Sequence, residues 1–370
     1  MAKFKLDYSN EKHVQLVKAM GSKNKIVAQE ANEIFAQLMS FIVQKLLDHA
    51  GSASLIYEDF TYNEDDDPSF PLDLFFAADE GEVTVWTQSQ AGGLPTSEIR
   101  GMSDMKFSPY QLNSAVSFKG VYARKARLDV VSMGVNRMFQ EILVKQERNA
   151  WFVIMKALGE ATTLDPENNT TADHITSATN AGTFVLHDLN VLMTLVRRNN
   201  ASWNGGTGVD SSGLTDLFVS PEVKENIRAF AYQPLNTTNP AQTAATATHT
   251  GIPLDDATRR DIFNSPGVQE LYGVAITEIL ELGTNRKYSK LFDLFSPVAY
   301  APATQQIIPG FDLSRGAFKR PVEADSETGS TFSTEVDDQW AKRTDTIGWF
   351  GSLREARIGL DGRAVAGIII

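Results

Sequence analysis

The sequence contains no cysteine, and this absence excludes several kinds of chemistry. No disulfide, thiolate metal site or cysteine nucleophile can form among its 370 residues. The sequence has no apolar run of about 18 residues, the minimum for a membrane-spanning helix. The first residues, MAKFKLDYSN, also lack the apolar stretch of a secretory signal peptide. From these absences we expect the chain to have no disulfide framework and no membrane-spanning segment.

Signatures of catalysis are missing as well. The sequence has no GxSxG elbow and no HExxH motif, and the glycines of Asn204–Gly208 are not followed by the Lys-Ser/Thr pair of a phosphate loop. None of the histidines has metal-ligand spacing, so we expect each to be an ordinary surface or cap residue. They are His13, His49, His174, His187 and His249. We therefore predict that the chain is not an enzyme and has no catalytic, cofactor-binding or metal residues.

The overall charge is acidic. The 34 basic and 46 acidic residues give a net charge of −12, which does not favour nucleic-acid binding by phosphate neutralisation. The hydrophobic fraction of 42% and charged fraction of 22% are ordinary for a globular protein. Because single cores usually split beyond about 250–300 residues, we expect two or more lobes.

Two long helices are predicted. Val135–Leu158 has no glycine or proline, and Gly134 and Gly159 stand just outside it. Its apolar residues recur with the helical period and form one stripe, at Val135, Met138, Phe139, Ile142, Leu143, Ala150, Ile154, Ala157 and Leu158. At about 1.5 Å per residue, this helix is a rod of roughly 36 Å. Its opposite face, with Arg137, Glu141, Lys145 and Arg148, is expected to contact water or a neighbour. Ile26–Ala50 is the second helix, with Gly51 as its stop.

An extended hairpin is predicted ahead of the longer helix. Gln111–Arg124 alternates as a strand, with Leu112, Val116, Phe118 and Tyr122 on one face. Glu82–Thr87 also alternates, and the glycine-rich segment Ala91–Met105 lies between the two. Because a lone two-stranded hairpin is marginally stable in water, this hairpin needs a surface to lie on.

The charges around the hairpin are segregated. The stretch from Glu58 to Glu82 is acidic without any Lys or Arg, whereas Arg100–Arg127 is basic apart from Asp104. Two interpretations stay open: these charges pair within the hairpin, or the basic limb meets the acidic stretch of a neighbouring subunit. For the run Glu64–Asp67 within the acidic stretch, a solvated loop is favoured over an ion site between subunits. Our candidates for contacts between subunits are Asp65, Asp66, Asp67, Trp86, Arg100, Lys106, Lys119, Arg124 and Trp203.

The remaining segments predict a mixed α+β fold without regular strand–helix alternation. Basic Met1–Lys25 is expected to be an arm whose order depends on a partner. Helices are expected at Phe184–Val196 and Pro221–Phe230, and strands at Ser54–Tyr62, Leu214–Ser220, Leu271–Glu281 and Tyr300–Ile308. Polar or flexible loops are expected at Ala161–Ala181, Asn199–Gly213, Gln233–Thr250 and Asp325–Thr334.

The order of these elements resembles the major capsid proteins of tailed bacteriophages with the HK97-type fold. Tyr272–Glu281 followed by Tyr300–Gly310 is similar to strand pairs of the family's A-domain, and the closing WFGSLREARIGLDGRAVAGIII is similar to the C-terminal strands of contractile-tailed phages. The resemblance implies an N-terminal arm and helix at 1–62 and an E-loop hairpin at 63–127. It further implies a P-domain spine helix at 128–183, an A-domain at 184–324 and C-terminal strands returning to the P- or A-domain at 325–370.

The resemblance also implies a function. The chain would self-assemble into hexamers and pentamers of an icosahedral phage head that encloses double-stranded DNA without reading its sequence. It would belong to the virion, assemble in the host cytoplasm, and have scaffold, portal and possibly decoration proteins as partners. The short basic start is expected for a mature form or for a separately encoded scaffold. Two alternatives stay open: an encapsulin-type cargo shell of the same fold, and an acidic cytosolic enzyme with a dimerisation arm.

Overall fold

The computed structural model describes residues 6–47, 51–63, 65–66, 69–71, 87, 104–165, 170–201, 213–229, 260, 270–326, 329–337 and 345–370. The chain divides into two compact units. Unit 1 comprises Met1–Phe70, Lys106–Ala150 and Lys319–Ile358, and unit 2 comprises Pro71–Met105, Trp151–Phe318 and Gly359–Ile370. Long helices and several sheets occur together, which confirms the predicted α+β class.

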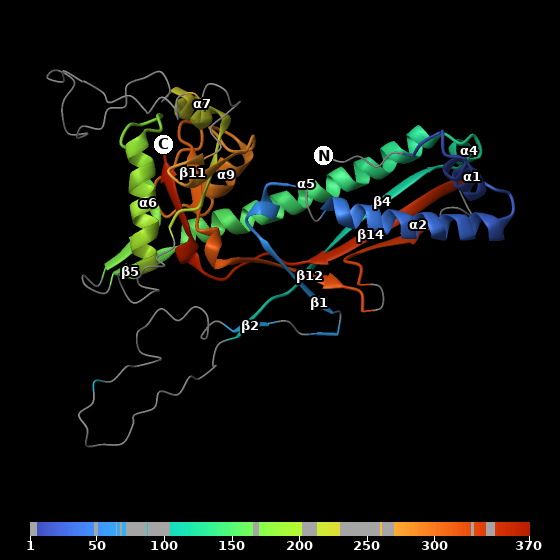
Figure 1. The fold of residues 1–370 in the computed structure, drawn as a ribbon, viewed down its shortest axis with the longest axis horizontal. Helices are drawn as coiled ribbons and strands as arrows, with labels where there is room; N and C mark the ends of the chain where they lie inside the picture. The colour runs from blue at the N-terminus through green and yellow to red at the C-terminus, as the bar shows by residue number, and fades with distance from the viewer. Residues whose placement is uncertain are drawn as a thin grey trace. The chain divides into compact units, whose positions relative to one another are not determined.

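A six-stranded sheet forms the framework of unit 1 (Figure 1). Its longest strands, β4 (Tyr110–Lys119) and β14 (Thr346–Glu355), pair antiparallel from Tyr110 opposite Glu355 to Lys119 opposite Thr346. The sheet order is β1 (Glu58–Asn63), β12 (Phe318–Ala324), β14 and β13 (Phe332–Val336), with β15 (Ile358–Gly359) also paired to β12. Strand β1 runs parallel to β12, so residues far apart in sequence become cross-strand neighbours.

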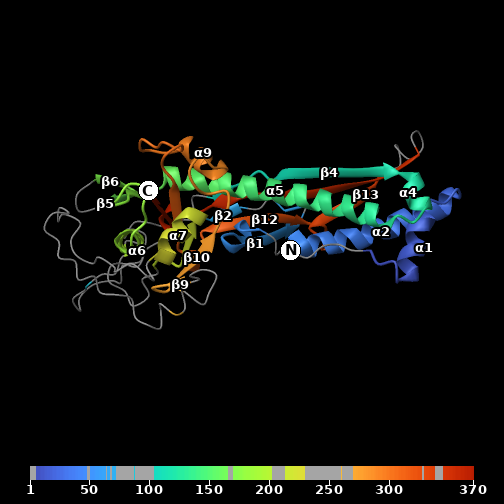
Figure 2. The same ribbon diagram turned by 90° about the horizontal axis from the view of Figure 1, so that it is seen from above.

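Helix α5 (Leu128–Glu160) contains the predicted long helix. In unit 1 its apolar stripe packs with residues of β4 and β14 in one core, and both views show α5 running along these strands (Figures 1 and 2). The predicted stripe is confirmed, since all its members except half-buried Ala157 are buried. The helix nevertheless continues through both glycines that were expected to lie outside it. At Gly134 a Cβ would lie 3.2 Å from the Val116 side chain, so this glycine allows α5 to approach β4 closely.

The N-terminal part of unit 1 is helical. Helix α1 (Glu11–Met20) packs against α2 (Lys25–Leu47) and α4 (Gly120–Arg124), as Figure 2 shows. Val17 and Met20 of α1 are buried in the core of unit 1. The expectation of an arm ordered by a partner is therefore wrong for α1, because the chain's own core holds this segment. The second long helix is confirmed as α2, and it is followed by the short helix η1 (Ala53–Leu55) and β1.

The predicted hairpin is corrected in part. The strand ends at Lys119 and α4 follows, so the predicted extension to Arg124 is wrong. The partner of β4 is β14 rather than Glu82–Thr87, most of which lies outside the described residues. A short pair, β2 (Ser69–Pro71) with β3 (Asp104–Lys106), brings together the two ends of the segment between them.

Unit 2 is built on a mixed sheet of order β7-β16-β11-β8-β10-β9. These strands are β7 (Ile175–Ser177), β8 (Asp216–Val219), β9 (Glu270–Leu271), β10 (Val274–Glu278), β11 (Ile307–Phe311) and β16 (Val365–Ile369). The helices of the unit are α6 (Leu186–Ala201), α7 (Pro221–Ala229) and α9 (Lys287–Asp293), with short helices η2 (Leu313–Arg315) and η3 (Gly362–Ala364). Leu192 of α6, Leu217 of β8 and Ile368 of β16 lie together in its buried core.

Several predicted boundaries in unit 2 change. Leu271–Glu281 contains a tight hairpin rather than one strand, because Tyr272 and Gly273 have positive φ and reverse the chain. Residues before Ile307 form turns instead of the expected strand. The expected loop Ala161–Ala181 holds β5 (Thr162–Asp165), β6 (Thr170–Asp173) and β7. In unit 1, β13 likewise begins inside the expected loop Asp325–Thr334. No helix in the described ranges is long and apolar enough to cross a membrane.

His174 also differs from the prediction of a surface or cap residue. Its side chain is fully buried in unit 2. Nδ1 donates to the backbone oxygens of Gly362 and Val365, at 3.0 and 2.9 Å, and Nε2 lies within hydrogen-bond distance of the Thr163 hydroxyl. The burial lowers the pKa of His174, and the two backbone oxygens oppose this shift only in part. The ring is therefore a neutral structural link between the β6–β7 turn and the C-terminal segment.

This burial predicts a pH dependence of stability. In the unfolded chain His174 has a pKa near 6.5, so below that pH the unfolded state binds more protons than the folded state. The free energy of unfolding should therefore fall as the pH drops from about 7.5 to 5.5, as measured by urea unfolding. His174→Gln should flatten this dependence, whereas His187→Gln, which removes an exposed ring, should keep it. An unchanged slope in His174→Gln would contradict the assignment.

Candidate functional site

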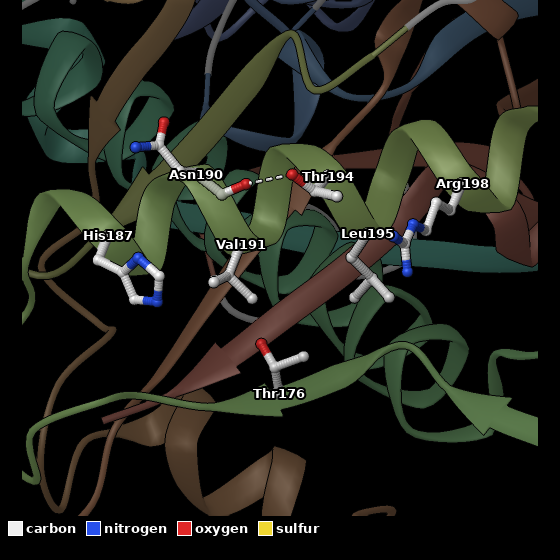
Figure 3. Close-up of a pocket in the computed structure, with 7 residues that line it drawn as sticks. All are labelled: Thr176, His187, Asn190, Val191, Thr194, Leu195 and Arg198. Carbon is white, nitrogen blue, oxygen red and sulfur yellow. Dashed lines mark hydrogen bonds between the residues drawn. The ribbon is translucent and has the colours of Figure 1, made fainter. Parts of the chain in front are cut away.

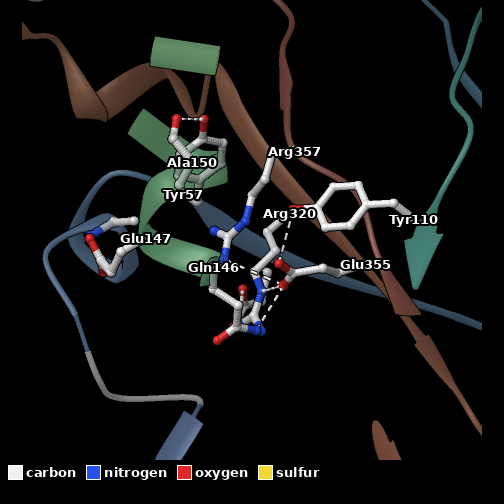
Figure 4. A network of polar contacts seen from close by, with 10 residues as sticks. Tyr57, Tyr110, Gln146, Glu147, Ala150, Arg320, Glu355 and Arg357 are labelled. Carbon is white, nitrogen blue, oxygen red and sulfur yellow. Dashed lines mark hydrogen bonds and ion pairs between the residues drawn. The ribbon is translucent and has the colours of Figure 1, made fainter. Parts of the chain in front are cut away.

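A buried cluster of charged side chains lies in unit 1 around Glu355, the last residue of β14 (Figure 4). The Glu355 side chain is fully buried. Its carboxylate accepts hydrogen bonds from Arg320 Nε at 2.9 Å, Gln146 Nε2 at 3.0 Å and the Tyr110 hydroxyl at 3.0 Å. Arg357 Nη2 adds an ion pair at 3.4 Å. The carboxylate therefore gathers donors from β4, α5, β12 and the chain just after β14.

A second layer of contacts surrounds this cluster. Arg320 Nη1 lies 3.3 Å from a carboxylate oxygen of Asp59 on β1. The Arg357 guanidinium lies 4.8 Å from the centre of the Tyr57 ring, and the Tyr57 hydroxyl donates to the Ala150 backbone oxygen of α5. Burial raises the pKa of Tyr57 and, together with the negative charge of Glu355, raises the pKa of Tyr110 to about 12. Both phenols are therefore neutral donors in any ordinary buffer.

The chemistry of this cluster is structural. Two guanidinium groups compensate the charge of Glu355, and the carboxylate oxygens are occupied by donors of the same chain. Within the described part of the chain, no group of three or more His, Asp or Glu residues could hold a metal ion. Our sequence reasoning missed this cluster. A signal was present, because Glu355 continues the odd-numbered alternation that buries Ile347, Trp349 and Leu353.

A shallow hollow of about 310 Å³ lies between α6 and β7 in unit 2 (Figure 3). Val191 and Leu195 point from α6 toward Thr176 of β7, and His187, Asn190 and Arg198 line the hollow along the same helix. Asp188 anchors the start of α6: its buried carboxylate accepts hydrogen bonds from the backbone amides of Thr179 and Val185, both at 3.0 Å. The sequence predicts a helix at Phe184–Val196, most of which is confirmed as α6, but it does not predict the hollow.

The predicted contact residues are only partly described. Asp67, Trp86, Arg100 and Trp203 lie outside the described residues. Asp65 and Asp66 are exposed just after β1, and Lys106 and Lys119 are exposed at the ends of β3 and β4.

Several charged residues of the acidic stretch and the basic limb form ion pairs that were expected neither from pairing within the hairpin nor from pairing with a neighbouring subunit. Arg124 pairs with Asp345, with Nη1 3.2 Å from a carboxylate oxygen. From the acidic stretch, Glu58 pairs with Lys319 and Asp59 pairs with Arg320, both across the β1–β12 strand pair. For Glu58, Asp59 and Arg124, the partner therefore lies in a C-terminal segment of the same chain, rather than in the other limb of the hairpin.

Comparison with known proteins connects this architecture to viral shells. No protein-family model and no curated protein matches the sequence. Among solved structures, the capsid of cyanophage P-SCSP1u is similar with a TM-score of 0.51 and 14% identity, covering 85% of this chain and 86% of that chain. The capsid of a native gene transfer agent (GTA) particle has a TM-score of 0.50 and 12% identity, covering 87% and 91%. The holo-SrpI encapsulin of Synechococcus elongatus PCC 7942 has a TM-score of 0.37 and 13% identity, covering 72% and 75%.

These comparisons confirm the predicted fold. The chain has the HK97-type architecture of phage and gene transfer agent capsids over most of its length. At identities of 12–14% the shared feature is the fold.

The buried cluster predicts a large stability loss when Glu355 is neutralised. Glu355→Gln leaves two buried guanidinium groups with less compensating charge, and breaking such a pair typically costs about 3–5 kcal/mol. The free energy of unfolding from urea denaturation should fall by that order. As a control, Glu141→Gln removes an exposed helical pair with Arg137, at 3.7 Å, and should cost at most about 0.5 kcal/mol. Equal effects of the two variants would show that the cluster does not stabilise unit 1.

Proposed function

We propose that the chain is the major subunit of a phage head, self-assembling as hexamers and pentamers into an icosahedral shell. The observation that carries the proposal is the HK97-type fold, shared over more than four fifths of the chain with two capsid structures. The role is structural, and its functional surfaces are the contacts between copies. Ring-closing contacts of this kind are heterologous, because one patch meets a different patch of the next copy.

An exposed apolar face on α2 supports assembly. Phe35 and Met39 are buried in the core of unit 1, whereas another side of the helix exposes large apolar side chains. These are Ile26, Val27, Ile34 and Leu38, with exposed fractions of 69%, 41%, 57% and 39%. Clustered apolar residues at a protein surface are typical of interaction sites. The hairpin beyond β2 and β3, our proposed E-loop, is a second candidate for contacts between copies.

The enclosed cargo is proposed to be double-stranded DNA. A net charge of −12 fits a wall along which DNA can slide without adhering. Further proposals are that scaffold, portal and possibly decoration proteins are partners, that the protein belongs to the virion, and that it assembles in the host cytoplasm. It also stays a prediction that the protein belongs to a contractile-tailed phage. The predicted contacts between subunits stay predictions as well: metal-free contacts at Asp65–Asp67, and contacts at Trp86, Arg100, Lys106, Lys119, Arg124 and Trp203.

Assembly can be tested directly. Purified protein, concentrated with and without candidate scaffold, should give shells, tubes or capsomer rings in negative-stain microscopy and light scattering. Particles isolated from the cells that produce the protein should contain nuclease-protected genomic DNA. Protein cargo without DNA would instead support an encapsulin-type shell, and a monomer or dimer under every condition would exclude both shells.

A deletion tests the hairpin. Removing Gly92–Arg100, which lies between the paired strands β2 and β3, should leave a folded subunit that assembles poorly. The melting temperature of the unassembled subunit should therefore change little, while the shell yield falls at least about tenfold, the effect of losing one interface hot spot. If the deletion unfolds the subunit, the hairpin belongs to the core and not to an interface.

A further inference from the structure

The tip of the β9–β10 hairpin holds an aromatic residue in an unfavourable backbone conformation. Tyr272 and Gly273 link the paired residues Leu271 and Val274, and their φ angles are +54° and +80°. A two-residue turn with positive φ at both positions is the type I′ turn, for which Asn-Gly is strongly preferred. A bulky residue is a rare outlier there. The Tyr272 side chain is nevertheless 58% exposed, so packing within its own chain does not account for its presence.

The hollow between α6 and β7 has properties that suit such a residue. Its volume of about 310 Å³ is large enough for an aromatic ring, and Val191 and Leu195 give it an apolar surface. The Thr176 hydroxyl oxygen is buried and has no hydrogen-bond partner in the described part of the chain. A buried hydroxyl without a partner is costly, and a phenol entering the hollow would supply one. Figure 3 shows Thr176 opposite Val191 and Leu195, across the space that a ring would fill.

The charges beside Tyr272 and along the hollow between α6 and β7 are also complementary. Glu270, on the same hairpin as Tyr272, is exposed. Arg198 and His187 are exposed along the hollow, and Arg198 forms no ion pair among the described residues. An acidic side chain beside the tyrosine would therefore meet a basic rim. Such charges at the edge of a contact mainly set its orientation and its rate of formation.

We propose that Tyr272 of one copy inserts into the α6–β7 hollow of the next copy. Strands β9 and β7 form the two ends of the same sheet, so the contact joins opposite sides of unit 2. A contact between opposite sides is head-to-tail, and such a contact gives a ring when its rotation closes and an open filament when it does not. This inference rests on the proposed function and gives one of its ring contacts: the ring packs on Val191 and Leu195, the phenol pairs with Thr176, and Glu270 faces Arg198.

A substitution separates folding from assembly. Tyr272→Asn creates the favoured Asn-Gly turn and removes the ring, so the melting temperature of the subunit should stay equal or rise. The protein concentration needed for assembly should increase at least about tenfold, as for the loss of an interface hot spot. Leu294→Asn is the matched control, because it removes another side chain of unit 2 that is 69% exposed, and it should assemble like the wild type.

The outcomes distinguish this contact from the general proposal. If the wild type forms rings or shells and Tyr272→Asn does so equally well, the Tyr272 contact is wrong and the capsid function stands. If the wild type never assembles, the proposed function fails. Charge exchange provides a second measurement: Glu270→Arg and Arg198→Glu should each slow assembly, and the double variant should recover it. Absence of recovery would contradict the Glu270–Arg198 pairing.

The absence of cysteine allows a covalent test in the full chain. A chain carrying Tyr272→Cys and Thr194→Cys should crosslink head to tail under mild oxidation. Denaturing gels should then show a ladder that ends at a closed ring of five or six copies. Thr194 is exposed on the lining helix, so a cysteine there should not disturb the core. A control chain with Leu294→Cys and Thr194→Cys should give no ladder, and shells that assemble without crosslinks in the test chain would overturn the proposal.

Discussion

The Glu355 carboxylate is the constraint on which unit 1 depends. Its donors come from Tyr110 on β4, Gln146 on α5 and Arg320 on β12, so the carboxylate is compensated only when all three elements are in place. An uncompensated buried charge costs several kcal/mol, and a one-residue slip of β14 would turn Glu355 to the opposite face of the sheet. The same side chain therefore sets both the register of β14 against β4 and the position of α5 beside them.

Sequence periodicity predicted the elements of this framework better than their partners. The apolar stripe of α5 and the inward face of β4 were both visible, because a period of 3.6 or 2 residues reports which face is buried. Periodicity does not report the strand on the other side of the ladder, and β14 is more than 200 residues away from β4. The structural role of the glycines near α5 was ambiguous for a related reason. A missing Cβ can end a helix or allow close packing, and at Gly134 the nearby Val116 side chain shows the second use.

The ion pairs could not be predicted from the sequence either, because they depend on which strands pair. The acidic stretch and the basic limb were apparent in the sequence, but the described partners of the acidic stretch follow from the register of β1 against β12. That register places Glu58 opposite Lys319 and Asp59 opposite Arg320, and both pairs form ion pairs. Cross-strand neighbours lie within reach of each other wherever strands pair, so such ion pairs can be predicted once the pairing is known. The buried role of His174 was hidden in the same way, because its partners Gly362 and Val365 come from the other end of the chain.

Surface features that cost the isolated subunit free energy point to its partners. The core of unit 1 compensates its buried charge, and the cores of both units hide most of their large apolar side chains. Against that background, Tyr272 occupies a turn that Asn would fit with less strain, and Ile26 and Ile34 stay in water on α2. Stability of the single chain accounts for none of the three. The proposed burial against another copy would account for all of them, because the same side chains that weaken the subunit alone would strengthen an assembly. This is the pattern expected under the proposed self-assembly of the chain.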